Sequence, residues 1–138
     1  MNYIKRDFKQ IGSDKWIITG GGHSQESINF MNDNNIGYEI NIIYENGVRV
    51  GNVFCHKDPK KAIGNGQTWF PKSWTKEKIE KAGNTVAKKV LKEGKKNGKF
   101  FGEVDGVRVG IILKNGKIET VFPDSKQEGA IKYERKKI

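Results

Sequence analysis

The sequence predicts an α+β domain with an antiparallel sheet and helices on one side of it. Strand-like segments follow one another along the chain and are joined by Asn-Gly or Asp-Gly pairs, which favour tight hairpins. One long segment, residues 76–93, has the periodicity of an amphipathic helix instead. This order segregates the helices from the sheet, as in the α+β class.

The chain has the size of one domain. Its 138 residues can bury a single core, which we expect over residues 16–124, with residues 125–138 as a polar tail. The lone Cys55 excludes an internal disulfide and a zinc site made of several cysteines. No apolar run approaches the ~18 residues of a membrane-spanning helix, and no signal-peptide core follows Met1, so we expect a soluble chain.

The first half of the chain places a glycine loop among strand-like segments. These segments are residues 15–18, 38–44 and 48–54. Residues 20–22 are glycines, which permit backbone angles and close approaches that other residues do not tolerate. Ser24 can cap a short helix over residues 25–32, which would place His23 at a helix N-terminus, where an anion is favoured.

The second half begins with the long helix. Its apolar and small residues recur with helical spacing and predict a core-facing stripe: Ile79, Ala82, Gly83, Val86, Ala87, Val90 and Leu91. Thr75 can cap the helix and Gly94 can end it. A meander follows, with strands over residues 100–104, 107–113 and 117–122. The middle strand is the most apolar, so we expect it at the centre of the sheet.

Most of the net charge of +10 lies in one part of the chain. Residues 56–100 hold 13 lysines and 4 acidic residues, a local charge of +9. Such a field attracts polyanions, including nucleic acids, and speeds their arrival. The alternative is a lysine-rich face that only keeps the protein soluble.

Two histidines, His23 and His56, lie in predicted connections, where functional residues tend to be found. An imidazole has an ordinary pKa of ~6.5 and can therefore act as an acid or a base near neutrality. Two of them are the minimum for cleavage of RNA without a metal. One would take the proton of the attacking 2′-hydroxyl, and the other would give a proton to the departing 5′-oxygen.

The loop before the long helix could supply further groups. Three cations could neutralise phosphate: Lys57, Lys60 and Lys61. Gln67 and Thr68 are candidate hydrogen-bond donors to a phosphate or a base. Trp69 is the best candidate for stacking on an unpaired base, whereas Phe70 and Trp74 are expected in the core.

The sequence has none of the common metal-binding spacings, such as HExxH, a DxD cluster or repeated CxxC, so no metal or cofactor is expected. Three alternatives to a metal-independent ribonuclease stay open. They are a basic domain that binds nucleic acid without cutting it, a metal-dependent DNase that uses both histidines as ligands, and a degenerate nuclease kept for partner binding.

Three blocks of sequence stand out together. They are Gly21-Gly22-His23-Ser24, the block QTWFPKSWT at residues 67–75 and the block KIETVFP at residues 117–123. With their spacing they cover about residues 16–124 and resemble the bacterial EndoU-type ribonuclease domains. Those domains are found at the C-termini of polymorphic and contact-dependent growth-inhibition toxins.

The resemblance implies an EndoU-like nuclease fold of the barnase–EndoU–colicin–RelE type, related to the coronavirus uridylate-specific endonuclease. It implies a metal-independent endoribonuclease that uses two histidines and a lysine and leaves a 2′,3′-cyclic phosphate, often on tRNA. It also implies that the domain is secreted or delivered within a larger toxin, acts in the target-cell cytoplasm and is neutralised by an acidic immunity protein.

Several residues match the family's motifs directly. His23 matches the histidine of its Gly-Gly-His motif, and Thr68 falls where the family has a Ser or Thr near the scissile phosphate. Thr120 matches the threonine of its T-x-[YF]-P ending. Phe122 stands where several relatives have a base-stacking tyrosine, which leaves a uridylate preference open.

Other positions depart from the pattern. Many relatives carry their other histidine about a dozen residues before Gly-Gly-His, but residues 8–12 contain none. We therefore interpret His56 as the second histidine. The family's lysine usually stands just before the Ser or Thr, where this chain has Gly66 and Gln67, so Lys57 or Lys61 would have to reach in.

We therefore expect a positively charged cleft in which each candidate residue has a distinct role. His23 and His56 form the acid–base pair, in an order left open; Lys57 stabilises charge; Thr68 and Thr120 position the substrate. The predicted RNA contacts are Ser24, Lys60, Lys61, Gln67, Trp69 and Phe122.

Overall fold

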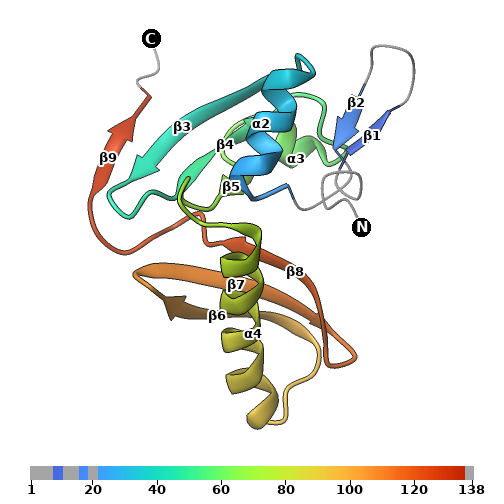
Figure 1. Ribbon diagram of the computed structural model, residues 1–138, viewed down its shortest axis with the longest axis vertical. Helices are drawn as coiled ribbons and strands as arrows, with labels where there is room; N and C mark the ends of the chain where they lie inside the picture. The colour runs from blue at the N-terminus through green and yellow to red at the C-terminus, as the bar shows by residue number, and fades with distance from the viewer. Residues whose placement is uncertain (1–7, 11–15, 19–21, 136–138) are drawn as a thin grey trace.

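A computed structural model describes residues 8–10, 16–18 and 22–135 of the chain. The α+β class is confirmed, but the strands form two main antiparallel sheets where one was expected, together with a two-stranded ribbon of β1 (Phe8–Gln10) and β2 (Trp16–Ile18). The chain leaves the first sheet at residue 69 and enters the second at residue 98, and a helix runs between them (Figure 1).

The first sheet has the strand order β5-β4-β3-β9. Its strands are β3 (Tyr38–Tyr44), β4 (Arg49–Val53), β5 (Gln67–Trp69) and β9 (Ile131–Glu134). Helix α2 (Gln25–Asp33) lies against this sheet, and the short helix α3 (Pro59–Ala62) lies in the connection from β4 to β5 (Figure 1). These elements are called the site lobe below.

The second sheet is the expected meander, and its middle strand is central as expected. Its strands are β6 (Gly98–Val104), β7 (Val107–Lys114) and β8 (Lys117–Pro123), paired in that order. The hairpins turn at Asp105-Gly106 and Asn115-Gly116, where all four residues have positive φ. With helix α4 (Lys76–Lys92) these strands form the meander lobe.

Helix α4 begins at the predicted cap, since the Thr75 side chain accepts a hydrogen bond from the Lys78 backbone N–H at 3.1 Å. Its stripe packs on one face of the meander sheet. The fit is close at Gly83, where a Cβ would come within 2.5 Å of Val121. Leu91, at the end of the stripe, is 39% exposed and lies outside the packed core.

The main core joins the two lobes. Val48, Val50 and Phe70 from the site lobe belong to the same buried cluster as the α4 stripe and the apolar face of β7. Phe70 stacks on Trp74 with ring centroids 5.1 Å apart, which confirms both as core residues. A second, smaller cluster lies between α2 and the first sheet and includes Met31, Val53 and Trp69.

Residues 125–138, expected as a polar tail, are ordered structure over the part that is described. Gln127 is buried, and its side-chain amide accepts from the backbone N–H of Arg108 (2.8 Å) and donates to the Arg108 carbonyl (3.0 Å). It also accepts from Asn46 at 2.9 Å. Strand β9 then pairs with β3. These long-range contacts connect the segment to both lobes. The local sequence pattern does not show them, because the partners lie far away along the chain.

Candidate active site

His23 is fixed by the strand that precedes the long helix. Gly22 has φ 73°, which turns the chain, and Ser24 caps α2 by accepting from the Ser27 backbone N–H. The His23 carbonyl accepts from the Phe70 N–H at 2.8 Å, and its ring Nδ1 lies 2.7 Å from the Thr68 carbonyl. Both the backbone and the ring of His23 are therefore held by residues 68–70.

The partner of the ring fixes its tautomer. A carbonyl oxygen can only accept, so His23 Nδ1 is the donor and carries the proton. In the neutral ring, Nε2 then has the free lone pair. This arrangement leaves His23 able to accept a proton at Nε2.

His56 has the opposite arrangement. Its backbone N–H donates to the Val53 carbonyl at 3.0 Å, which fixes the His56 backbone in a turn at the end of β4. The backbone N–H of Asp58 donates to His56 Nδ1 at 2.9 Å, which requires a lone pair there and places the proton of the neutral ring on Nε2. That Nε2 is buried and has no hydrogen-bond partner among the described residues.

The two imidazoles lie within electrostatic range of each other and of Lys61. The pKa of His23 is lowered to about 4, chiefly by burial; the hydrogen bond to Thr68 raises it, and the charges of Lys61 and His56 contribute to the lowering. Burial also lowers the pKa of His56 to about 4, with Lys61 again lowering it and Asp58 raising it. Both rings are therefore neutral at pH 7 when no anion is bound.

The loop that carries Lys61 is held in place by neighbouring strands. Asn41 and Asn52 both donate from their side chains to the Gly64 carbonyl, at 3.0 and 2.9 Å. Asp58 caps α3 by accepting from the Lys60 backbone N–H at 3.0 Å. Lys57 and Lys60 are exposed, whereas Lys61 is partly buried and its charge lowers the pKa of both histidines.

The meander lobe also contributes residues next to His23. The centroid of the Phe122 ring lies 6.0 Å from that of His23. Thr120 precedes Phe122 by two residues on β8, so both side chains face the same side of the sheet. The KIETVFP block at residues 117–123 is thus brought next to His23.

Three residues predicted to contact RNA are buried and contact other parts of the protein instead. Trp69 is 0% exposed in the second core cluster, so its ring is not available to a base, and the stacking prediction for it is wrong. Gln67 is equally buried, and its Nε2 lies 3.4 Å from the Gly22 carbonyl and 3.3 Å from the Thr68 carbonyl. Ser24 is buried as the cap of α2.

Thr68 is also buried, and its hydroxyl lies 3.3 Å from His23 Nδ1. In this structure the hydroxyl therefore contacts the Nδ1 side of the His23 ring. A direct contact between Thr68 and a phosphate stays a prediction.

Sequence analysis missed Arg49, which is only 3% exposed. One guanidinium nitrogen donates to the Gln25 side chain at 2.6 Å and another to the Phe70 carbonyl, so Arg49 joins the first turn of α2 to the segment that holds His23. Burial lowers its pKa to about 10, which leaves it charged at neutral pH. The available signal was a single charged residue in an otherwise uncharged strand-like segment, RVGNV.

Within residues 8–10, 16–18 and 22–135, no group of three or more His, Cys, Asp and Glu side chains is arranged to hold a metal ion. None of the helices in this part of the chain is long and apolar enough to span a membrane.

Comparison with known proteins gives one match. The family model of the bacterial EndoU nuclease matches residues 10–125, which include both histidines, Lys61, Thr120 and Phe122. Searches of curated proteins and of solved structures found no match. Since the family model covers most of the 138 residues, the chain belongs to the bacterial EndoU nuclease family.

Proposed function

We propose that this nuclease domain is an endoribonuclease toxin that cleaves RNA without a metal, by attack of the 2′-hydroxyl on the adjacent phosphorus. The observation that carries the proposal is that His23 lies within electrostatic range of His56 and Lys61, which come from the distant connection between β4 and β5. Two imidazoles and a cation are the groups that this reaction requires.

His23 acts as the general base. Its Nδ1–H is engaged by the Thr68 carbonyl, so Nε2 is the nitrogen that takes the proton of the 2′-hydroxyl. The resulting imidazolium is stabilised by the same short hydrogen bond, which favours the charged ring. Oxygen 2′ then forms its bond to phosphorus while the bond from phosphorus to oxygen 5′ breaks.

His56 acts as the general acid and gives its Nε2 proton to the departing 5′-oxygen. To act as an acid it must first be cationic, which requires a proton on Nδ1 in place of the hydrogen bond that this atom accepts from the Asp58 N–H, and its low pKa disfavours this in the free protein. A bound phosphate between the two rings supplies negative charge that offsets the effect of Lys61 and raises both pKa values. Lys61 stabilises the additional negative charge on the phosphorane.

We infer tRNA as the substrate and an acidic immunity protein as the inhibitor. Both are suggested by the resemblance to the EndoU toxin domains, and the local charge of +9 over residues 56–100 suits a polyanionic substrate and an acidic protein that covers the same face. We further propose that the domain is delivered within a larger toxin and acts in the cytoplasm of the target cell.

The test is cleavage of purified tRNA in the presence of EDTA by the wild type, His23→Ala and His56→Ala. We expect the wild type to produce fragments ending in a 2′,3′-cyclic phosphate. Each substitution should lower the rate at least ~100-fold, the lower end of general acid–base contributions. Lys89→Ala, at an exposed position on α4, is the control for loss of a single charge.

Other outcomes would overturn the proposal in identifiable ways. Loss of activity in EDTA together with degradation of plasmid would indicate a metal-dependent DNase. Retardation of tRNA without shortening would indicate a binding domain. Full activity of His56→Ala would remove His56 from the reaction, and circular dichroism of each variant shows whether the fold is kept.

A further inference from the structure

One face of the meander sheet, opposite α4, carries a row of aromatic rings that begins at the site. Phe101 on β6 and Phe122 on β8 meet edge to face with centroids 5.8 Å apart, and both rings are partly exposed. They lie over Gly110 of the central strand, where a Cβ would come within 2.4 Å of Phe122 and 2.9 Å of Phe101. The glycine lets both rings lie directly on the backbone of β7.

A cation lies over each ring. The Arg108 guanidinium carbon is 4.7 Å from the Phe101 centroid, and Lys99 Nζ is 5.6 Å from the Phe122 centroid. Arg108 is also held by Asp124, with 2.7 Å between Nε and a carboxylate oxygen. The arginine side chain is 46% exposed and Asp124 only 21%, so the ion pair fixes the guanidinium while leaving part of it open to solvent.

The row is continuous with the catalytic groups. It runs from His23 to Phe122 at 6.0 Å, from Phe122 to Phe101 at 5.8 Å, and from Phe101 to Arg108 at 4.7 Å. Unpaired RNA bases stack on aromatic rings and on guanidinium planes, and nearby cations contact the phosphates between them. The row has both kinds of group, with Lys99 beside Phe122 and Arg108 beside Phe101.

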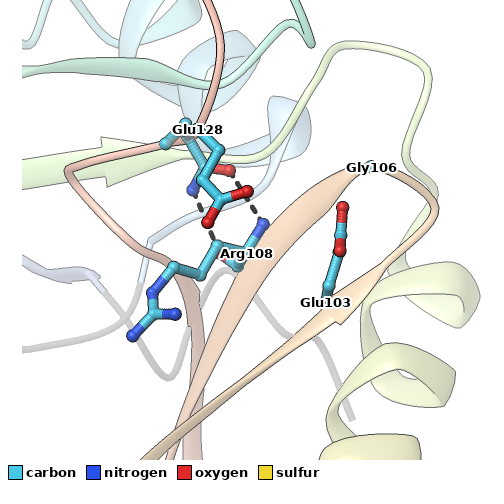
Figure 2. Close-up of a pocket in the computed structure, with 5 residues that line it drawn as sticks. Glu103, Gly106, Arg108 and Glu128 are labelled. Carbon is cyan, nitrogen blue, oxygen red and sulfur yellow. Dashed lines mark hydrogen bonds between the residues drawn. The ribbon is translucent and has the colours of Figure 1, made fainter.

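A shallow hollow at the far end of the row has the opposite character. It is lined by Glu103, Gly106, Arg108, Gln127 and Glu128. Figure 2 shows the Arg108 guanidinium extending away from Glu103, so the two glutamates set the charge of the hollow. Phosphate would be repelled there, which limits the usable row to the stretch between His23 and Arg108.

We propose that Arg108 and Phe101 form a second base-binding platform for single-stranded RNA, one nucleotide beyond the base held at Phe122. The base stacks on the guanidinium of Arg108, which Phe101 supports from below, and Lys99 contacts the intervening phosphate. The proposal rests on the proposed function, because it assumes that RNA is cut at His23 and His56.

The test compares two RNA substrates: mixed-sequence hexanucleotides and mixed-sequence dinucleoside monophosphates, which are too short to reach the platform. The ratio of kcat/KM between hexamer and dinucleotide measures all contacts beyond the dinucleotide, and its change in a platform variant measures the contribution of the platform. We expect Arg108→Lys, which keeps the charge and loses the plane, to lower this ratio ~10-fold, within the range found for single stacked bases. Phe101→Leu should lower it in the same direction.

The matched control is Arg135→Lys, at another exposed arginine, which directly follows β9 and forms an ion pair with Glu39. It should leave the ratio as in the wild type. A second measurement uses wild-type protein and hexamers with one abasic position on either side of the cut. One of these should lose the same factor as Arg108→Lys, and Arg108→Lys should show no further loss on it.

Failure of the two proposals can be told apart. A wild type that cuts neither substrate overturns the proposed function itself. A wild type that cuts both, with an unchanged ratio in Arg108→Lys and Phe101→Leu and no loss on the abasic hexamers, overturns the platform and leaves the ribonuclease in place.

Discussion

The two lobes bury different kinds of residue. Among the described residues, the buried polar or charged side chains are His23, Ser24, Ser27, Arg49, Asn52, His56, Gln67, Thr68 and Gln127. All except Gln127 belong to the site lobe or its loops. The meander lobe instead buries the stripe of α4 and the apolar face of β7.

The site lobe therefore carries most of the energetic cost of burying polar side chains. A buried polar group costs about 1–3 kcal/mol when it lacks a partner, so each one must be hydrogen-bonded or serve a purpose. The meander lobe provides stability and a surface of rings, while the site lobe holds two neutral imidazoles in place. The proposed reaction needs both, since Phe122 and His23 come from different lobes.

The largest effect that tests this contrast is a cavity in the meander lobe. Ile111 is 0% exposed on the central strand, and Ile111→Ala should lower the free energy of unfolding by about 3–4 kcal/mol through lost apolar contacts. Ile112→Ala, at the partly exposed neighbour on the other face, should cost clearly less. Urea denaturation of both variants measures this, and equal losses would contradict a core confined to one face of β7.

Acid pH should destabilise the site lobe for a different reason. The pKa of His23 is about 4 in the folded state and ~6.5 when unfolded, so the unfolded state binds more protons between these values. Stability is thus retained above pH 6.5 and falls as the pH decreases to 4, by about 3 kcal/mol from His23. Denaturation curves across this range check the prediction.

His23→Gln is the matched control, since it keeps a polar side chain and removes the titration. Its stability should depend less on pH between 6.5 and 4 than that of the wild type. An equal dependence in both proteins would show that His23 titrates normally in the folded state.

The regular elements were predictable because their patterns are local. The spacing of apolar residues in α4 predicts its buried face, and Thr75 directly before it predicts its cap. The apolar strand β7 is central, as predicted. Strand β5 was not predicted, because its three residues pair only through β4. The pairing of β9 and the contacts of Gln127 were missed for the same reason, as their partners lie far away in sequence.

The site was predictable in its chemistry and less so in its geometry. The types of residue singled out both histidines as candidates, and the structure brings them within electrostatic range of each other. No pattern shows whether Lys57 or Lys61 lies near them, since this depends on how α3 packs. Trp69 was misplaced because an aromatic residue in a loop reads as exposed, whereas pairing of β5 with β4 turns its ring into the second core cluster.

The low pKa values also predict the dependence of activity on pH. In the free protein, the fraction of cationic His56 falls tenfold for each pH unit above its pKa of about 4. If His56 is the acid and chemistry limits the rate, kcat/KM should rise ~100-fold from pH 7 to pH 5. Initial rates on a dinucleotide substrate measure this profile.

Lys61→Met sharpens the same measurement. Lys61 lowers the pKa of both histidines, so its removal should move the falling limb of the profile to higher pH. A profile that is flat from pH 5 to 8 in the wild type would contradict His56 as the acid.

The smallest expected effect concerns Gln127, which among the described residues is the buried polar side chain outside the site lobe and its loops. Gln127→Ala removes hydrogen bonds to both backbone groups of Arg108 and to Asn46, and should lower stability by about 1–3 kcal/mol. Because the lost contacts hold Arg108 and the adjoining segment, KM on long RNA should rise while the pH dependence of stability stays that of the wild type. Glu128→Ala, at the exposed neighbour, should change stability little. If Gln127→Ala altered the pH profile of His56 instead, the polar contacts of the two lobes would be coupled, and the division between a stabilising lobe and a catalytic one would fail.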